Sequence, residues 1–464
     1  MRSQVSEPQS HGSEGSSMQK RFMDVSAEAE QKQEQRFSLW LSGEGIPFVD
    51  EKAAAAYRER VTLIKDAIQL KKTPSRIPIC PSAGFFPVQY AGVSMYDAMY
   101  DYEILTGAWE KYCHDFTPDA YNSPTTVVPG KPLEILDFKL CKWPGQGISK
   151  HQEYQYVEKE YMKADEYQDL IDDPTGYFMS TYFPRIFGSL KPLEKMPLLP
   201  PVNEIPCIPP ALIPFGTEEL QSAFRTLVAA GQETIRWISA VRRLNGSIMG
   251  QGYPAFSGGF TKAPFDVIGD TLRGTRGIML DMFRHPDELR EACERITPFM
   301  VKSGVASCKA TGHIMPLIPL HKGADGFMSD EQFRTFYWPT LRKLIIGLVN
   351  EGFVPQLFAE GGYNQRLETI CDLPKGKTVW WFDLTDMQRA KKTVGQVACL
   401  AGNVPISLLC TATPDSVRTY CKNLMDSAGK DGGFIFSTGA GMQGSRIENV
   451  KAMIDFSKQY AVNR

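Results

Sequence analysis

The sequence predicts a parallel α/β architecture, and three observations favour it. Short apolar runs alternate with helical patterns over about 400 residues. The runs are too uniformly apolar for a sheet with one face in water, which indicates strands buried on both faces. No G-x-G-x-x-G opens a helix after the first strand and no G-x-x-x-x-G-K-[ST] occurs, so we expect no nucleotide cofactor. The alternation alone fits either a closed barrel or an open, doubly wound sheet.

The chain begins with an extension. Residues 1–20 are rich in Ser, Gln, Glu and Gly and are expected to be disordered. The charged stretch 27–36 has helical propensity, and the apolar stretch 37–41 follows it. This arm either covers a partner subunit or packs on its own domain, and the second interpretation is favoured. The predicted organisation is therefore an N-terminal extension over 1–52, partly disordered, and one α/β domain over 53–464.

The regular part starts with a helix over Ala53–Leu70, whose apolar positions share one face, and a short buried strand over Arg76–Cys80. Pro184–Pro214 is rich in proline and is expected to form a long extended loop. The further strand candidates are Thr126–Val128, Ser247–Gly250, Val305–Ala310, Val354–Phe358, Thr378–Phe382, Ala398–Ala401 and Gly433–Ser437. The helix candidates are Thr217–Leu244, Pro264–Arg273, Asp287–Val305, Asp330–Glu351, Met387–Val394, Pro414–Ala428 and Ile447–Tyr460.

Composition excludes several classes of protein. With 42% hydrophobic and 22% charged residues among 464, the chain is typical of a globular protein. A net charge of -2 gives no overall attraction to nucleic acid or anionic lipid. No secretory signal and no apolar stretch long enough to span a membrane is present, so we expect a cytoplasmic protein. Ten cysteines without a C-x-x-C pair fit a reducing compartment, and the six histidines include no HExxH metal motif.

Six segments carry motifs that occur together in one enzyme family. They are Gly259–Phe265 with Phe283–Asp287, Gly326–Phe333 with Trp338-Pro339, Leu400–Pro405, Thr413–Val417, Gly433–Gly439 and Glu448–Met453. In this order, they resemble the uroporphyrinogen decarboxylase superfamily. The resemblance runs from about Ala53 to the C-terminus, and it implies a (β/α)8 TIM barrel with the site at the C-terminal ends of the strands.

The decarboxylase chemistry of this superfamily fits the sequence poorly. The family's Arg-x-x-x-Arg falls on Pro81 and Phe85, its aspartate falls within the carboxylate-free segment 124–126, and its Gly-His-Gly histidine falls on Ala440. Losing two arginines would leave substrate carboxylates unpaired, at about 2–5 kcal/mol for each desolvated partner. Decarboxylation of a tetrapyrrole therefore remains only an alternative, with Asp383 as the residue on which a rearranged site would depend.

The superfamily's zinc-assisted methyl transfer implies a His-x-Cys and a later Gly-Cys-Gly as ligands. These positions are Phe358, Glu360 and Ala440, so only Glu360 could bind a metal. Glu360 ends an apolar run, where a general acid or base or an oxygen ligand of a barrel enzyme would lie. An N-cap or a salt bridge would explain the same residue equally well.

His321 stands in a polar break after an apolar run, and there it could donate a proton or bind zinc together with Glu360. An ordinary surface loop is the alternative interpretation. Asp383 follows the next strand and is a further catalytic candidate, and Asn403 is expected to position a loop or the substrate. His313 is expected to be a buried histidine with satisfied hydrogen bonds.

The predicted substrate-binding residues are mostly apolar. Phe85, Phe86 and Phe358, together with Asn403 and Ala440, are expected to contact the substrate, which favours a molecule smaller and less charged than a porphyrinogen. The tyrosine-rich stretch 152–167 could form a lid or pack on the surface.

The resemblance and the residues together predict methyl transfer. A small methylated substrate, such as a methoxylated aromatic, would bind at the barrel mouth. A corrinoid on a separate protein would donate or accept the methyl group, and zinc is a conceivable metal at Glu360 and His321. No nucleic-acid or membrane partner is expected, and a homodimer is compatible with the sequence. The alternatives are decarboxylation in tetrapyrrole metabolism and a barrel that binds without catalysis.

Overall fold

The computed structural model describes residues 25–197, 199 and 202–462. The segment 1–20, for which disorder is predicted, lies outside these residues. Within the described part, no helix combines the length and the apolar character that crossing a membrane requires.

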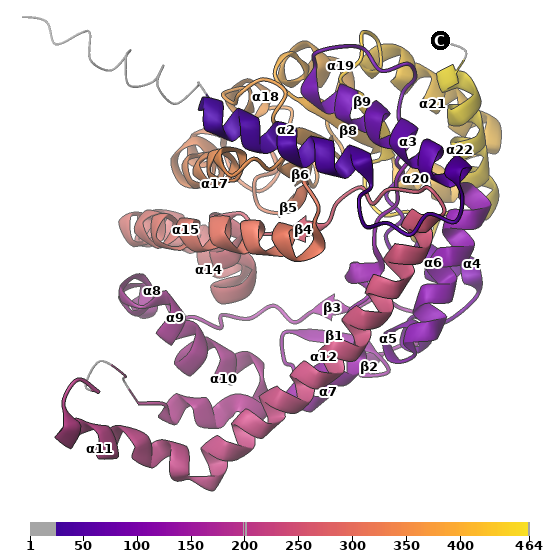
Figure 1. Ribbon diagram of the computed structural model, residues 1–464. Coiled ribbons are helices and arrows are strands. Elements are labelled where there is room, and N and C mark those ends of the chain that lie inside the picture. Colours follow the sequence, from indigo (N-terminus) through magenta and orange to yellow (C-terminus); the bar gives the residue numbers. More distant parts are fainter. Residues whose placement is uncertain (1–24, 198, 200–201, 463–464) are drawn as a thin grey trace, which may run out of the picture.

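The core is a closed parallel barrel (Figure 1). Six strands are hydrogen-bonded in chain order: β4 (Gly259–Phe260), β5 (Pro316–Leu320), β6 (Gln356–Ala359), β7 (Val379–Phe382), β8 (Cys399–Val404) and β9 (Phe434–Thr438). Two short segments close the ring. Ile79 pairs in parallel with Phe436 of β9, Asp119 donates its backbone N–H to Ile79, and Tyr121 pairs in parallel with Ala255 just before β4. The predicted (β/α)8 TIM barrel is therefore confirmed.

Helices surround this barrel and decorate it. They are α2 (Ala27–Ser42), α3 (Glu51–Gln69), α4 (Phe86–Ala91), α5 (Met95–Tyr100), α6 (Tyr102–Phe116), α7 (Gly130–Leu136), α8 (Tyr167–Asp172), α9 (Pro174–Tyr177), α10 (Phe183–Ile186), α11 (Ile208–Leu212), α12 (Glu218–Gly250), α13 (Pro264–Asp266), α14 (Gly274–Arg284), α15 (Pro286–Thr311), α16 (Asp330–Gln332), α17 (Trp338–Asn350), α18 (Leu367–Ile370), α19 (Met387–Lys392), α20 (Ile406–Thr411), α21 (Pro414–Ala428) and α22 (Ile447–Val462). Figure 1 shows α12 extending from the barrel toward α11.

A small second sheet lies in the long insertion between the second and third barrel strands. It consists of β1 (Cys141–Pro144), β2 (Gly147–Ile148) and β3 (Gln155–Tyr156), in the order β2-β1-β3. The tyrosine-rich stretch 152–167, for which the sequence left open a lid or surface packing, contributes an edge strand of this sheet, β3.

The N-terminal arm packs on its own chain. Ser26 caps α2, and Phe37 and Trp40 of this helix are 0% and 6% exposed. Arg36 donates to the backbone oxygen of Glu351, at the end of α17. The favoured interpretation of the arm, a helix that covers its own domain, agrees with these contacts.

Several predicted strands are wrong. Ser247–Gly250 is the last turn of α12, Val305–Ala310 lies inside α15, and Thr126–Val128 begins with the last residue of the 3₁₀ turn Pro124–Thr126. The apolar residues of the first two segments belong to the buried faces of α12 and α15. A short apolar run by itself does not distinguish a strand from a helix segment. The predicted extended loop Pro184–Pro214 instead contains short helices. Several of its prolines stand in the first turn of a helix, where the backbone N–H would have no partner within the helix.

Candidate active site at the barrel mouth

The barrel register brings the predicted site residues into one layer. His321, Glu360 and Asp383 each follow directly after the last residue of a strand, β5, β6 and β7 respectively. The last paired residues of these strands face one another, Leu320 opposite Ala359 and Ala359 opposite Phe382. Because side chains alternate along a strand, Glu360 shares the inward face with Phe358, and Asp383 shares it with Trp381. The rings of Phe358 and Trp381 stack at 4.1 Å and fill the barrel below this layer.

His321 lies between two carboxylates. Its Nδ1 is 2.5 Å from Oδ2 of Asp270, and its Nε2 is 3.5 Å from Oε1 of Glu360. The Glu360 side chain is 43% exposed and the His321 side chain 32%, so both reach solvent, whereas that of Asp270 is only 14% exposed. His321 and Glu360 therefore lie next to each other, as predicted from the sequence. Because Asp270 accepts from Nδ1, a proton on Nε2 would point toward Glu360.

Asp270 was missed by the sequence reasoning. It also binds Nζ of Lys262 at 2.8 Å and Nζ of Lys322 at 3.1 Å. It lies in a π-helical turn, Val267–Leu272, a rare widening of a helix that often accompanies functional sites. Gly269 in this turn allows the close approach of Lys322, since a Cβ there would lie 2.8 Å from Cδ of Lys322.

Asp266, one helical turn earlier, fixes the backbone that carries His321. Its side chain is fully buried and accepts three hydrogen bonds, from the backbone N–H groups of His321 (3.0 Å) and Lys322 (3.1 Å) and from the Tyr337 hydroxyl (2.7 Å). Asp266 and Asp270 are four residues apart within the predicted helix Pro264–Arg273. That spacing places two carboxylates on one helix face, and it was the signal that could have found them.

The carboxylates and the histidine have displaced pKa values. Burial raises the pKa of Glu360, the charge of His321 opposes that rise, and the charges of Asp266, Asp270 and Asp383 add to it. Burial acts to lower the pKa of His321, but its hydrogen bond to Asp270 and the nearby carboxylates raise it above its ordinary value. Burial acts to raise the pKa of Asp270, yet His321 and the lysines hold it well below its usual range. The site therefore joins a carboxyl group whose pKa is raised to a histidine whose pKa is also raised.

Asp383 and Asn403 support the neighbouring loops. Asp383 Oδ2 accepts from the backbone N–H of Gly361, next to Glu360, at 3.0 Å, and burial raises the pKa of Asp383. Asn403 donates from Nδ2 to the backbone oxygens of Asp383 (3.0 Å) and Thr385 (2.7 Å). Asn403 thus positions a loop, one of the two roles predicted for it.

The other residues that were predicted to contact the substrate lie in different parts of the structure. Phe86 is fully buried in α4 against Tyr112 and Phe116, so its expected contact with a substrate conflicts with its position in the core. Phe85 is partly buried, and its ring meets that of Tyr154 edge to face at 5.9 Å. Ala440 is partly buried just after β9, and its backbone oxygen accepts from the Thr438 hydroxyl.

His313 lies outside the site. It is 8% exposed, and its ring nitrogens contact the backbone oxygen of Ala255 (3.0 Å) and the backbone N–H of Met315 (3.1 Å). Burial lowers the pKa of His313 to about 4. It is the buried, satisfied histidine that the sequence suggested.

The side chains at the mouth do not fit a zinc ion. Structural and catalytic zinc sites need at least three protein ligands. Within residues 25–197, 199 and 202–462, no group of three His, Cys, Asp or Glu side chains could hold a metal. His321 Nδ1 is already bound to Asp270, and the ammonium groups of Lys262 and Lys322 lie against the same carboxylate. The pair Glu360 and His321 alone is an incomplete ligand set.

We therefore expect protein purified without chelator to contain far less than one zinc per chain. Glu360→Ala should leave the metal content unchanged, because no complete ligand set is lost. Elemental analysis of both proteins by mass spectrometry checks this. One zinc per chain in the wild type, lost in Glu360→Ala, would contradict it.

Comparison with known proteins finds one matching family model and several relatives of low identity. Residues 237–460 match the sequence model of the family described as "Uroporphyrinogen decarboxylase (URO-D)". The uroporphyrinogen decarboxylase of Saccharophagus degradans is 27% identical over 279 residues, which cover 55% of this chain and 76% of the relative. That of Cellvibrio japonicus is 26% identical over 303 residues, covering 59% and 82%.

Among solved structures, a methyltransferase from Methanosarcina mazei is similar with a TM-score of 0.54 and 14% sequence identity. The similarity covers 87% of this chain and 98% of that one, and it shows a shared fold. Asp266, Asp270, His321 and Glu360 all lie inside the matched family segment. Over residues 237–460, the chain therefore matches the uroporphyrinogen decarboxylase family model, in agreement with the resemblance seen in its sequence.

Proposed function

We propose that this protein demethylates a small methyl ether and delivers the methyl group to a corrinoid carried by a separate protein. The observation that carries the proposal is the pair Glu360 and His321. A carboxyl group with a raised pKa lies at the open mouth of the barrel, with its Oε1 3.5 Å from the Nε2 of a histidine held by Asp270. This is the arrangement of a general acid beside a group that stabilises its conjugate base.

The chemistry of ether cleavage requires such an acid. The acceptor supplies the electron pair of the new bond to the methyl carbon, and the electron pair of the broken C–O bond stays on oxygen. Protonation by Glu360 converts this oxygen into a neutral hydroxyl, which is a better leaving group. Glu360 is then a carboxylate, and charged His321, 3.5 Å away, stabilises it. Asp270 holds the ring of His321 in the orientation that this requires.

The surroundings favour a neutral, aromatic substrate. The rings of Phe85, Tyr154 and Tyr156 form an edge-to-face series with centroids 5.9 and 6.0 Å apart, and Tyr156 is 63% exposed. Burial raises the pKa of both tyrosines, and the charge of Glu360 adds to this rise. Such rings can stack on a methoxylated aromatic ring.

The cations at the mouth do not favour a polyanionic porphyrinogen. Lys262 and Lys322 both bind Asp270, so each ammonium group already has a carboxylate partner within the protein. The positions of the two family arginines are Pro81 and Phe85. The solved structure of similar fold is a methyltransferase, and the proposed reaction belongs to that class.

Direct assay with defined reactants tests the proposal. The purified protein is incubated anaerobically with methoxylated phenols and free, reduced cobalamin, while the methylated cobalamin is followed by absorbance and the phenol by chromatography. Both products should appear in equal amounts. Conversion of uroporphyrinogen without any demethylation would overturn the proposal in favour of decarboxylation.

Replacing His321 with Gln should shift the pH dependence of the reaction. Activity falls as pH rises through the pKa of Glu360, because the acid loses its proton. The charge of His321 lowers the pKa of Glu360, so its removal should move this alkaline limb to higher pH while the maximal rate falls. The measurement is kcat/KM against pH.

His285→Gln, a change in a half-exposed histidine before α15, is the matched control and should leave the alkaline limb in place. A limb that stays or moves to lower pH in His321→Gln would contradict the assignment.

A further inference from the structure

Two neighbouring loops carry the acid pair. We call residues 321–329, which follow β5, the histidine loop, and residues 360–366, which follow β6, the glutamate loop. His321 is the first residue of one and Glu360 the first of the other. The separation of their side chains therefore depends on how these two loops are held together.

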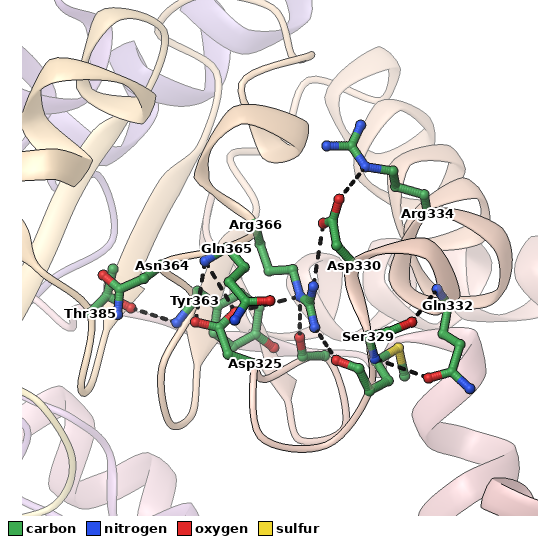
Figure 2. Close-up of polar contacts among 12 residues, drawn as sticks. Asp325, Ser329, Asp330, Gln332, Arg334, Tyr363, Asn364, Gln365, Arg366 and Thr385 are labelled. Carbon is green, nitrogen blue, oxygen red and sulfur yellow. Dashed lines mark hydrogen bonds and ion pairs between the residues drawn. The ribbon is translucent and has the colours of Figure 1, made fainter.

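The Arg366 guanidinium lies between these loops and is completely buried (Figure 2). It ends the glutamate loop, yet its polar partners belong to the histidine loop and the helix after it. Nε donates to the backbone oxygen of Gly323 (3.2 Å), and Nη2 to that of Met328 (2.5 Å). Nη1 donates to Asp330 Oδ1 at 3.3 Å, and Nε lies 3.6 Å from Asp325 Oδ1. One side chain thus contacts four residues of the opposite chain segment.

Asp325 completes the connection from the other side. Its backbone N–H donates to the oxygen of Gly362 at 2.8 Å, and both its carboxylate oxygens accept from the N–H of Gln365 at 3.2 Å. The hydroxyl of Tyr363 donates to the oxygen of Leu320, the residue before His321, at 3.2 Å. The two loops are therefore joined at several positions, through Gly362, Tyr363, Gln365 and the buried Arg366.

Only arginine suits this place. Its planar group offers five donors in a fixed fork, whereas lysine offers a single charged point with three donors. The ring of Phe333 lies 4.8 Å from the guanidinium carbon and covers it. A charge with no exposed surface is tolerated because two carboxylates and two carbonyl oxygens surround it. Such a rigid connection transmits a displacement of one loop to the other.

We propose that Arg366 is a positioning residue that sets the separation of Glu360 from His321. This inference rests on the proposed function only for its effect on rate, since the geometry of the pair exists without a substrate. Arg366 touches neither side chain and acts through the two loops. A misplacement of about 1 Å in a catalytic group can cost about 10²-fold in rate.

The test uses Arg366→Lys in the full chain, with two readouts. Methyl transfer should fall about 10²-fold through kcat, with KM little changed. Independently, the pKa of His321, followed by NMR of labelled imidazoles, should fall, because the charge of Glu360 helps to raise it and would lie farther away. Arg342→Lys is the matched control. Arg342 binds Asp372 outside both loops, and its replacement should change neither readout.

Two further variants keep the proposal falsifiable if Arg366→Lys does not fold. Asp325→Asn weakens the same connection without removing the buried cation and should also lower the pKa of His321. In Arg366→Ala, millimolar guanidinium chloride should restore part of the rate and of the His321 pKa. An unchanged His321 pKa in the folded variants would overturn the positioning role. Absence of demethylation by the wild type would overturn the proposed function alone, because the NMR readout needs no substrate.

Discussion

Glu360→Gln is expected to lower kcat for demethylation about 10²–10⁴-fold, the contribution typical of a general acid. Glutamine keeps the size and can still accept hydrogen bonds, but it has no acidic proton to give to the leaving oxygen. Substrate contacts with the aromatic rings remain, so KM should change little. Steady-state rates with a methoxylated phenol measure both quantities.

Two comparisons separate this chemical role from a general defect. Glu331→Gln changes an exposed glutamate in α16 and should retain wild-type activity. A substrate whose phenol is strongly acidic needs little protonation on leaving, so Glu360→Gln should be much less impaired with it. Equal loss with acidic and weakly acidic leaving groups would show that Glu360 does not donate the proton.

The layer of His321, Glu360 and Asp383 could be predicted from the sequence. Each residue directly follows a buried apolar run, and the carboxyl ends of parallel strands meet at one end of a barrel. The runs before Glu360 and Asp383 were recognised as strands. β5 was not among the strand candidates, although its apolar run was noted before His321. Its prolines, at 316 and 319, weaken the strand pattern.

The partners of this layer could not be predicted in the same way. Asp270 and Asp266 come from a helix some 50 residues before His321, at sequence separations of 51 and 55. A strand pattern fixes which residues share an end of the barrel, but it does not fix how far a helical turn reaches over that end. Their spacing of four residues was visible, whereas the widened turn that brings Asp270 to His321 was not.

Arg366 shows a second limit of sequence reasoning. An arginine between two polar loops is typical of a solvated surface, and composition gives no reason to bury it. Its burial depends on backbone oxygens of Gly323 and Met328, which every residue has and no sequence pattern marks. Only the three-dimensional path of the histidine loop makes arginine necessary there.

Asp266→Ala is expected to lower the free energy of unfolding by about 3 kcal/mol or more. Three buried donors, the N–H groups of His321 and Lys322 and the Tyr337 hydroxyl, lose their acceptor, and each unsatisfied group costs about 1–3 kcal/mol. Chemical denaturation, with the slope checked for two-state behaviour, measures the change. Asp287→Ala removes an exposed carboxylate at the start of α15 and should cost less than about 1 kcal/mol.

Asp266→Asn tests whether the hydrogen bonds that Asp266 accepts, or its charge, account for its contribution to stability. Oδ2 of Asp266 accepts from His321 and Tyr337, and Oδ1 accepts from Lys322. An asparagine oxygen can keep the first two contacts, but its amide group would face the N–H of Lys322. The variant should therefore lie between wild type and Asp266→Ala in stability. Burial raises the pKa of Asp266, so its charge is disfavoured, and a neutral amide is less costly to bury. A loss in Asp266→Asn as large as in Asp266→Ala would mean that the charge, rather than the accepted hydrogen bonds, holds the backbone of His321 in place.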